Sequence, residues 1–115
     1  MTVQITRLTD AEPTCPPGHT NVQPLLLQGG PHAPTTDLVV LLSHYLPGGR
    51  ADPEVMTTET VYVVVAGQLT VSADGTDTTL HPYDSVRIDP GTIRALENRG
   101  PLPTSIIVVR STHTT

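Results

Sequence analysis

The side chains best suited to chemistry lie in two short polar segments of the chain. Glu54, Met56 and Thr60 follow a Pro-Gly-Gly segment, and Arg94 follows an Asp-Pro-Gly segment. A carboxylate can accept or donate a proton, and a guanidinium is a permanent cation whose planar fork of donors fits a carboxylate or an enolate. If the fold brings these groups together, they suit acid–base chemistry on a small anionic, hydroxylated or carbonyl compound.

Two further side chains could take part in proton transfer. His44 carries an imidazole, and Tyr62 carries a hydroxyl that could donate to a substrate oxygen. Side chains alternate between the two faces of a strand, so His44 and its neighbour Tyr45 cannot both point inward. The sequence leaves open which of the two does, and Tyr62 could equally be the largest core side chain. The other histidines are expected in loops, turns or the tail: His19, His32, His81 and His113.

The spacing of glycines around the first polar segment resembles the first sequence motif of the cupin family. That motif reads Gly, five residues, His, any residue, His, three or four residues, Glu, six residues, Gly. Counted from Gly48, the two histidine positions hold Glu54 and Met56, and the glutamate position holds Thr60. The motif then ends at Gly67.

The second polar segment resembles the second cupin motif. Gly91 and Asn98 match that motif, Pro90 stands one place late, and the position of its histidine ligand holds Arg94. Together the two motifs and their flanking strands cover roughly residues 37 to 110. The resemblance implies an all-β chain that forms a single-domain antiparallel jelly-roll barrel.

The resemblance also implies where a metal would be bound, and these residues change that expectation. A cupin metal site holds its ion with three imidazoles and one carboxylate. Glu54, Met56 and Thr60 do not supply that set, although a register slip could bring Glu59 to the carboxylate position. Arg94 has no lone pair to offer and would repel a divalent ion. We therefore predict a cupin without metal or other cofactor, for which metal-dependent dioxygenase or decarboxylase chemistry is the less favoured interpretation.

Two functions follow from the resemblance, and the sequence does not separate them. The first is a metal-independent isomerase or lyase, of the dehydratase or cyclase type, acting on a small molecule. Its candidate catalytic residues are His44, Glu54 and Tyr62, and its candidate substrate-binding residues are Arg94, Thr60 and Met56. The second is a non-catalytic ligand-binding or structural module, in which Arg94 and Glu54 form an internal salt bridge.

Composition limits the partners and the location. A chain of 115 residues can close one core, and a net charge of -5 with no lysine offers no basic patch for nucleic acid or an anionic membrane surface. The chain has no Phe and no Trp, so its core must be aliphatic. The single cysteine, Cys15, excludes an intrachain disulfide, and no secretory or membrane-spanning segment is recognisable. We expect a cytoplasmic protein that binds a small molecule and forms a homodimer.

β-Branched runs alternate with Gly, Pro and Asp clusters, which is typical of an antiparallel barrel or sandwich. The strands are expected at Val22–Leu27, Leu38–Leu46, Thr60–Val65, Gln68–Ser72, Thr78–Leu80, Ser85–Ile88, Ile93–Glu97 and Ser105–Arg110. Chain reversals are expected at Pro47-Gly48-Gly49, Ala66-Gly67, Ala73-Asp74-Gly75 and Asp89-Pro90-Gly91. Residues 1–36 are expected to form an arm and first strand, 37–110 the barrel, and 111–115 a flexible tail.

Overall fold

The computed structural model describes residues 2–114, and nearly all the regular structure within them is strand. One 3₁₀ turn, η1 (Leu8–Asp10), precedes the strands. The strands are β1 (Glu12–Pro13), β2 (His19–Gln28), β3 (Leu38–Val55), β4 (Thr58–Ala66), β5 (Leu69–Ala73), β6 (Thr76–Leu80), β7 (Ser85–Ile88), β8 (Ile93–Glu97) and β9 (Thr104–Thr114). The prediction of an all-β chain is confirmed.

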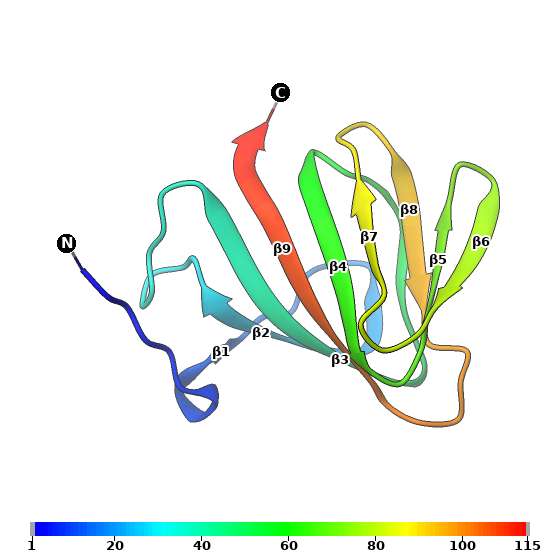
Figure 1. Cartoon of the computed structure of the whole chain (residues 1–115), viewed down its shortest axis with the longest axis horizontal. Coiled ribbons are helices and arrows are strands. Elements are labelled where there is room, and N and C mark those ends of the chain that lie inside the picture. Colours follow the sequence, from blue (N-terminus) through cyan, green and yellow to red (C-terminus); the bar gives the residue numbers. More distant parts are fainter. Residues whose placement is uncertain (1, 115) are drawn as a thin grey trace.

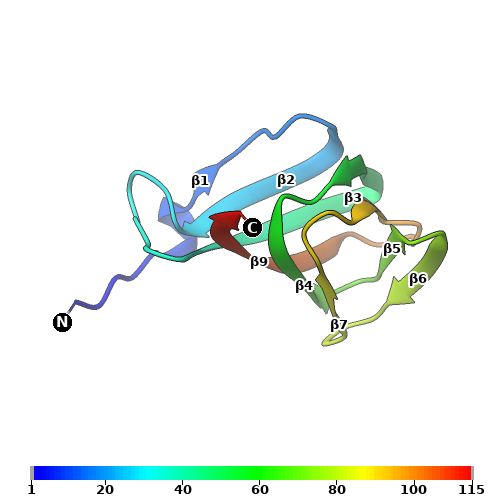
Figure 2. The ribbon, with the colours of Figure 1, turned by 90° about the horizontal axis from the view of Figure 1, so that it is seen from above.

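The strands form an antiparallel sheet that curls into a nearly closed jelly-roll barrel. Along the sheet the order is β6-β5-β8-β3-β9-β4-β7, and β2 pairs with both β1 and β3. Figure 1 shows β9 between β3 and β4, and Figure 2 shows the strands from above, arranged around a common interior. Because the sheet curls on itself, one face of each strand is turned toward a shared core.

The long strand β3 connects the two sides of the barrel. Its first half pairs with β9, ending at Tyr45 opposite Thr104, and its second half pairs with β8, where Glu54 lies opposite Arg94. The chain reversal predicted at residues 47–49 is therefore wrong. The Pro-Gly-Gly segment instead bends β3 while its backbone stays bonded, because Gly48 N donates to Asn98 O at 2.8 Å.

The buried hydrophobic residues are aliphatic apart from two tyrosines, as the composition predicts, and a few polar residues and Arg94 are buried beside them. Burial alternates along several strands, for example at Thr104, Ile106 and Val108 on β9. The buried hydrophobic residues are Leu41, Tyr45, Ala51, Tyr62, Val64, Leu69, Val71, Leu80, Ile88, Leu96, Ile106 and Val108. Their burial stabilises the barrel by about 25 cal/mol for each Å² of apolar surface removed from water.

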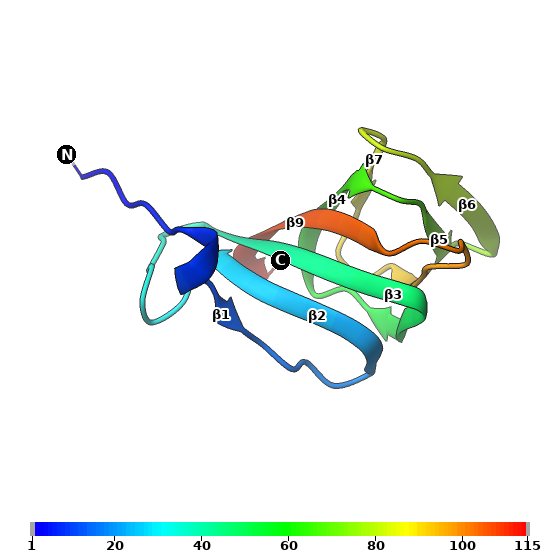
Figure 3. The same ribbon diagram turned by 90° about the horizontal axis from the view of Figure 1, so that it is seen from below.

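Several predicted boundaries need correction. Glu12–Pro13 forms the short strand β1 within a segment expected to be loop, and β2 begins at His19 rather than at Val22. Figure 3 shows β1, β2 and β3 side by side, so the N-terminal residues extend the sheet. The tail expected from residue 111 belongs to β9 as far as Thr114, and Thr115 lies outside the described residues. Within residues 2–114, no helix has the length and apolar character that a membrane crossing requires.

Candidate functional site

A cavity of about 170 Å³ lies inside the barrel and opens at one end. Its apolar wall comes from Leu41, Leu96 and Val108, whose side chains alternate inward on β3, β8 and β9. Polar side chains converge on the same space: Ser43, Tyr45, Glu54, Thr60, Tyr62 and Arg94. An apolar wall combined with converging polar groups is a common form of small-molecule site. At about 170 Å³ this cavity is smaller than most ligand pockets, so it suits only a small ligand.

Arg94 is buried at this site and is held by three contacts. The residue is only 5% exposed. Its Nε donates to the Tyr62 hydroxyl at 2.9 Å, and its Nη1 donates to the Asp52 carbonyl at 3.0 Å. Its Nη2 lies 3.6 Å from Oε2 of Glu54. These contacts fix the guanidinium plane on the inner wall, as expected from its position in the second motif.

Glu54 lies directly opposite Arg94 in the β3–β8 pairing, so the two side chains share one face. Its side chain is 59% exposed, whereas that of Arg94 is 6% exposed. The ion pair therefore sits at the mouth of the cavity and leaves the space behind it open. A titratable carboxylate thus faces a ligand-sized volume beside a fixed cation.

Tyr62 and Thr60 enter the cavity from β4, and Met56 lies at the β3–β4 connection. The Tyr62 hydroxyl accepts from Arg94 and donates to the Met56 sulfur at 3.7 Å. The Thr60 hydroxyl donates to the Thr58 carbonyl at 3.1 Å, so its oxygen retains acceptor capacity toward the cavity. These residues, singled out from the sequence, lie together with Glu54 and Arg94.

The alternation of β3 settles the question left open between His44 and Tyr45. Tyr45 is buried and lines the cavity, whereas His44 lies on the outer face with Nδ1 2.9 Å from the Ser105 hydroxyl. His44 is absent from the cavity wall, so the catalytic role considered for it has no geometric basis. The register places Tyr45 inward together with Ser43 and Leu41, which lie two and four residues earlier on the same face of β3 and are also buried.

The sequence interpretation gave Tyr45 no role, although it is a buried polar group of the cavity. Burial raises the pKa of its hydroxyl well above the usual value, the neighbouring Tyr62 adds to that effect, and Arg94 opposes it. Within residues 2–114, no buried side-chain nitrogen or oxygen lacks a hydrogen-bond partner. The Tyr45 hydroxyl bonds to no other described residue, so it must reach the open space of the cavity.

His19 and Arg110 also line the cavity and were not anticipated. The sequence interpretation placed His19 in a loop because the strand was expected to begin only at Val22. The Pro-Pro-Gly turn directly before His19 could have indicated that the strand starts at this residue. Arg110 was expected at the end of a strand, but β9 continues past it to Thr114.

The donor set at the four motif positions does not fit a divalent metal ion. Arg94 brings a guanidinium with no lone pair, and Met56 and Thr60 offer only a thioether and a hydroxyl. Among the described residues, no three His, Cys, Asp or Glu side chains converge as a metal site would require. Glu54 would be the one carboxylate ligand in this set, and it is already paired with Arg94.

Comparison with known proteins identifies the class. Residues 41–110 match the family model of the cupin domain, and the chain belongs to the cupin family. The fold and the enclosed cavity are those of a small-molecule cupin.

Individual relatives add detail to this assignment. The chain is 40% identical to the β-D-galactosidase Rv1717 of Mycobacterium tuberculosis over 97 aligned residues. This alignment covers 84% of each protein. Its fold is similar to the polyketide cyclase RemF from Streptomyces resistomycificus, with a TM-score of 0.84 and 16% identity over 98% of this chain and 82% of that one. It is also similar to KdgF from Halomonas sp., with a TM-score of 0.75 and 18% identity over 97% and 96% of the two chains.

Proposed function

We propose that this cupin is a small glycoside hydrolase that binds a β-galactoside in the barrel cavity and cleaves it by acid–base catalysis. Two lines support the proposal. The mycobacterial relative is named a β-D-galactosidase, and it is similar to most of this chain. The observation that carries the chemistry is the Glu54 carboxylate, 3.6 Å from Arg94 and exposed at the mouth of a ligand-sized cavity.

In this proposal Glu54 acts as the proton acceptor. A carboxylate in an ion pair is available to take a proton from a water molecule as that water attacks the anomeric carbon. Its partner Arg94 is fixed by Tyr62 and by the Asp52 carbonyl, which keeps the carboxylate oriented at the cavity mouth. Removing the carboxylate charge should therefore abolish most of the turnover.

The remaining polar side chains would bind the sugar. Arg94 offers donors to sugar oxygens, Thr60 offers an acceptor, and the phenol of Tyr62 could turn its hydrogen from the Met56 sulfur to a sugar oxygen. Met56 and the apolar wall would contact the C–H groups of the sugar ring. The cavity of about 170 Å³ suits one sugar ring better than an extended chain, so the leaving group would lie outside its mouth.

Isomerisation, dehydration and cyclisation need the same kind of proton transfer. Hydrolysis is preferred here because the relative at 40% identity carries a hydrolase name, whereas the neighbours at 16% and 18% identity support the fold alone. The non-catalytic alternative, a cavity that retains a sugar without changing it, is tested by the same experiment.

The test is hydrolysis of 4-nitrophenyl β-D-galactoside by the purified chain, with the α-galactoside as the substrate control. We expect turnover of the β-anomer in excess chelator, because the motif positions offer no metal-binding set. Glu54→Gln should lower kcat by about 100-fold or more, the usual contribution of a general base. Glu59→Gln is the matched control, since Glu59 pairs with Arg87 on the outer surface.

Three outcomes would overturn the proposal. The first is a rise in melting temperature with galactose but no release of nitrophenol, which would indicate a binding module. The second is full activity of Glu54→Gln. The third is loss of activity in chelator together with one equivalent of metal by elemental analysis, which would restore metal-dependent chemistry.

A further inference from the structure

We infer that His19 is the second proton-transfer group of this cavity and donates a proton to the departing oxygen of the glycoside. The inference rests on the proposed function, because it names a partner for Glu54 in the same reaction. It assigns a role to a residue that lies outside both cupin motifs.

The reaction needs a second group because one carboxylate cannot do both proton transfers at once. Glycoside hydrolysis ordinarily uses two carboxyl groups, one to activate water and one to protonate the leaving oxygen. Among the described residues that line this cavity, Glu54 is the one carboxylate. Another kind of side chain must therefore supply the acid, and His19 is the one imidazole among the described residues of the cavity wall.

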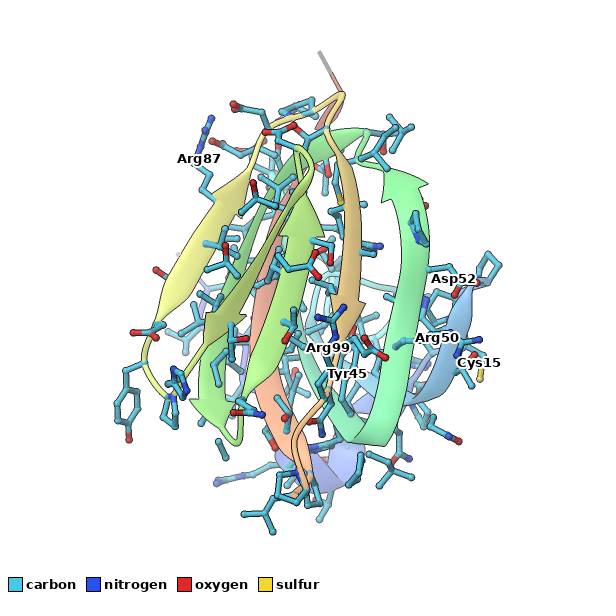
Figure 4. The ribbon with its side chains drawn as sticks, turned by 90° about the vertical axis from the view of Figure 1, so that its right-hand side faces the viewer. Cys15, Tyr45, Arg50, Asp52, Arg87 and Arg99 are labelled. Carbon is cyan, nitrogen blue, oxygen red and sulfur yellow. The ribbon has the colours of Figure 1, made fainter. Side chains whose placement is uncertain are left out.

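The strand register turns His19 toward the cavity. His19 begins β2 and lies opposite Ala51 of β3, which is 1% exposed and points into the barrel. Residues directly opposite each other in an antiparallel pair share one face, so His19 points inward as well. The position is secured by a hydrogen bond from Asp52 N to the Gly18 carbonyl at 2.8 Å. Figure 4 shows Asp52 and Cys15, which precedes β2, on the same side of the barrel.

A backbone contact fixes which ring nitrogen can react. Nδ1 of His19 lies 3.1 Å from the Pro17 carbonyl oxygen. A carbonyl oxygen only accepts, so Nδ1 must carry a hydrogen and donate it. Nε2 is then the nitrogen that gains and loses a proton. Two consecutive prolines, Pro16 and Pro17, stiffen the segment that supplies this carbonyl.

The spacing along β3 predicts the stereochemical course. Ala51 marks the level of His19, and Glu54 lies three residues further along β3, beyond an irregularity in its pairing with β8. At about 3.3 Å per residue, the two groups are offset by at most roughly 10 Å along the strand direction. Both residues line the same cavity. Groups about 6.5–9.5 Å apart leave room for a water molecule and are typical of inverting enzymes. We expect a β-galactoside to release α-galactose first.

The step balances without any further reactant. The water oxygen bonds to the anomeric carbon while its proton passes to Glu54. The bond from that carbon to the leaving oxygen breaks, and this oxygen takes the proton from Nε2 of protonated His19. The products are the inverted sugar, the free alcohol, a protonated Glu54 and a neutral His19. Solvent at the exposed mouth then returns the proton from Glu54 to His19.

The experiment compares two leaving groups in the full-length chain. A 2,4-dinitrophenyl galactoside has a leaving oxygen that departs without protonation, whereas methyl β-D-galactoside needs an acid. His19→Asn keeps a donor for the Pro17 carbonyl and removes Nε2. We expect it to lower kcat/KM for the methyl galactoside by about 100-fold or more and to leave the dinitrophenyl substrate within a few-fold of wild type. The control is His81→Asn, at an exposed turn outside the cavity wall.

Each outcome has a defined meaning. If His19→Asn lowers both substrates equally, or neither, while wild type turns them over, His19 is not the acid and the proposed hydrolysis still stands. If wild type hydrolyses neither substrate, the proposed function itself fails. Proton NMR of the first product supplies a second check, because initial release of β-galactose would contradict the inverting arrangement of Glu54 and His19.

Discussion

At the scale of single residues, Arg94 occupies the place of a metal ligand in the cupin motif but cannot act as one, and it pairs with Glu54 instead. Arg94 takes the place of a cupin histidine ligand and faces the same interior, but it is a permanent cation and binds oxygen atoms rather than a metal. Its contacts with Tyr62 and Asp52 are made from a nearly buried guanidinium, whereas Glu54 remains largely in solvent. The stability supplied by Arg94 should therefore come mainly from those two contacts and little from the ion pair.

A double-mutant cycle on Arg94 and Glu54 tests that division. Arg94→Met should lower the free energy of unfolding by about 1.5–3 kcal/mol, the range for a lost charged hydrogen bond, and should weaken ligand binding or turnover by about tenfold or more. Glu54→Met should be nearly neutral for stability, and the coupling between the two changes should stay below about 1 kcal/mol. Urea unfolding measures both terms. The matched control is Arg50→Met, an exposed arginine paired with Asp52.

If Arg94→Met has the ligand affinity and the melting temperature of wild type, Arg94 does not contact the ligand and its assignment to the binding site is wrong. A coupling of several kcal/mol would instead mean that the ion pair with Glu54 is its main structural role.

Tyr45 gives a prediction on pH. Burial raises the pKa of its hydroxyl in the folded state above the usual value of about 10. The stability that follows from keeping the proton is fully present below about pH 10 and is lost as the pH rises toward the folded-state pKa. The melting temperature of the wild type should therefore fall more steeply above about pH 10 than that of Tyr45→Phe. Tyr83→Phe, at a residue 84% exposed, is the control and should follow the wild type.

At the scale of elements, the bend in β3 positions the site. The strand leaves its pairing with β9 and joins β8 across residues 46–50, which carries Glu54 to the strand that holds Arg94. Gly48 has a φ of 80°, in the left-handed region that favours glycine. Gly49 is constrained by space, because an added Cβ would lie 2.5 Å from the Asn21 carbonyl oxygen.

We expect alanine substitutions at Gly48 and Gly49 to lower the stability of the fold by different amounts. Gly48→Ala should cost about 1–2 kcal/mol, since its side chain meets open space and only the backbone is strained. Gly49→Ala should cost more than Gly48→Ala and should lower turnover as well, because the clash is with backbone atoms and β3 must shift. Thermal unfolding and the galactoside assay measure both effects. Equal costs at the two positions would contradict the role given to the close approach of Asn21.

At the scale of the whole molecule, the outer face of the sheet is unusually apolar. Across β2, β3, β9 and β4, neighbouring outward side chains form the row Leu25, Leu42, Ile107 and Val63. A parallel row runs through Val40, Val109 and Val61. These side chains are partly exposed and do not belong to the buried core. A twofold partner that covers such a face removes apolar surface from water.

We therefore expect a homodimer that associates through this outer face, which includes β2. Light scattering at tens of micromolar should give about twice the chain mass of 12.2 kDa. Leu42→Glu should shift the mass to that of one chain, because a charge would have to be buried at the centre of the interface. The control is Thr78→Glu on the exposed strand β6. A wild-type mass of one chain would count against the dimer.

The all-β barrel could be predicted from the amino-acid sequence, which also singled out five residues that line the cavity: Glu54, Met56, Thr60, Tyr62 and Arg94. Glycine spacing and β-branched runs indicated the barrel, and Arg94 was expected to face the interior because it occupies the histidine place of the second motif. The replacement of the cupin metal ligands could also be seen in the sequence, because the ability to donate a lone pair to a metal depends only on the residue type. Whether the protein binds metal remains a prediction for elemental analysis.

Contacts between distant segments of the folded chain decide which side chains meet. The register of β3 placed Tyr45 inward and His44 outward, and a shift of one residue would have reversed them. The bend at residues 47–49 depends on backbone bonds to Asn98, a residue distant in sequence. His19 reaches the cavity because β2 starts opposite Ala51, a long-range pairing. Such contacts join segments far apart in the chain, so local pattern and propensity cannot specify them.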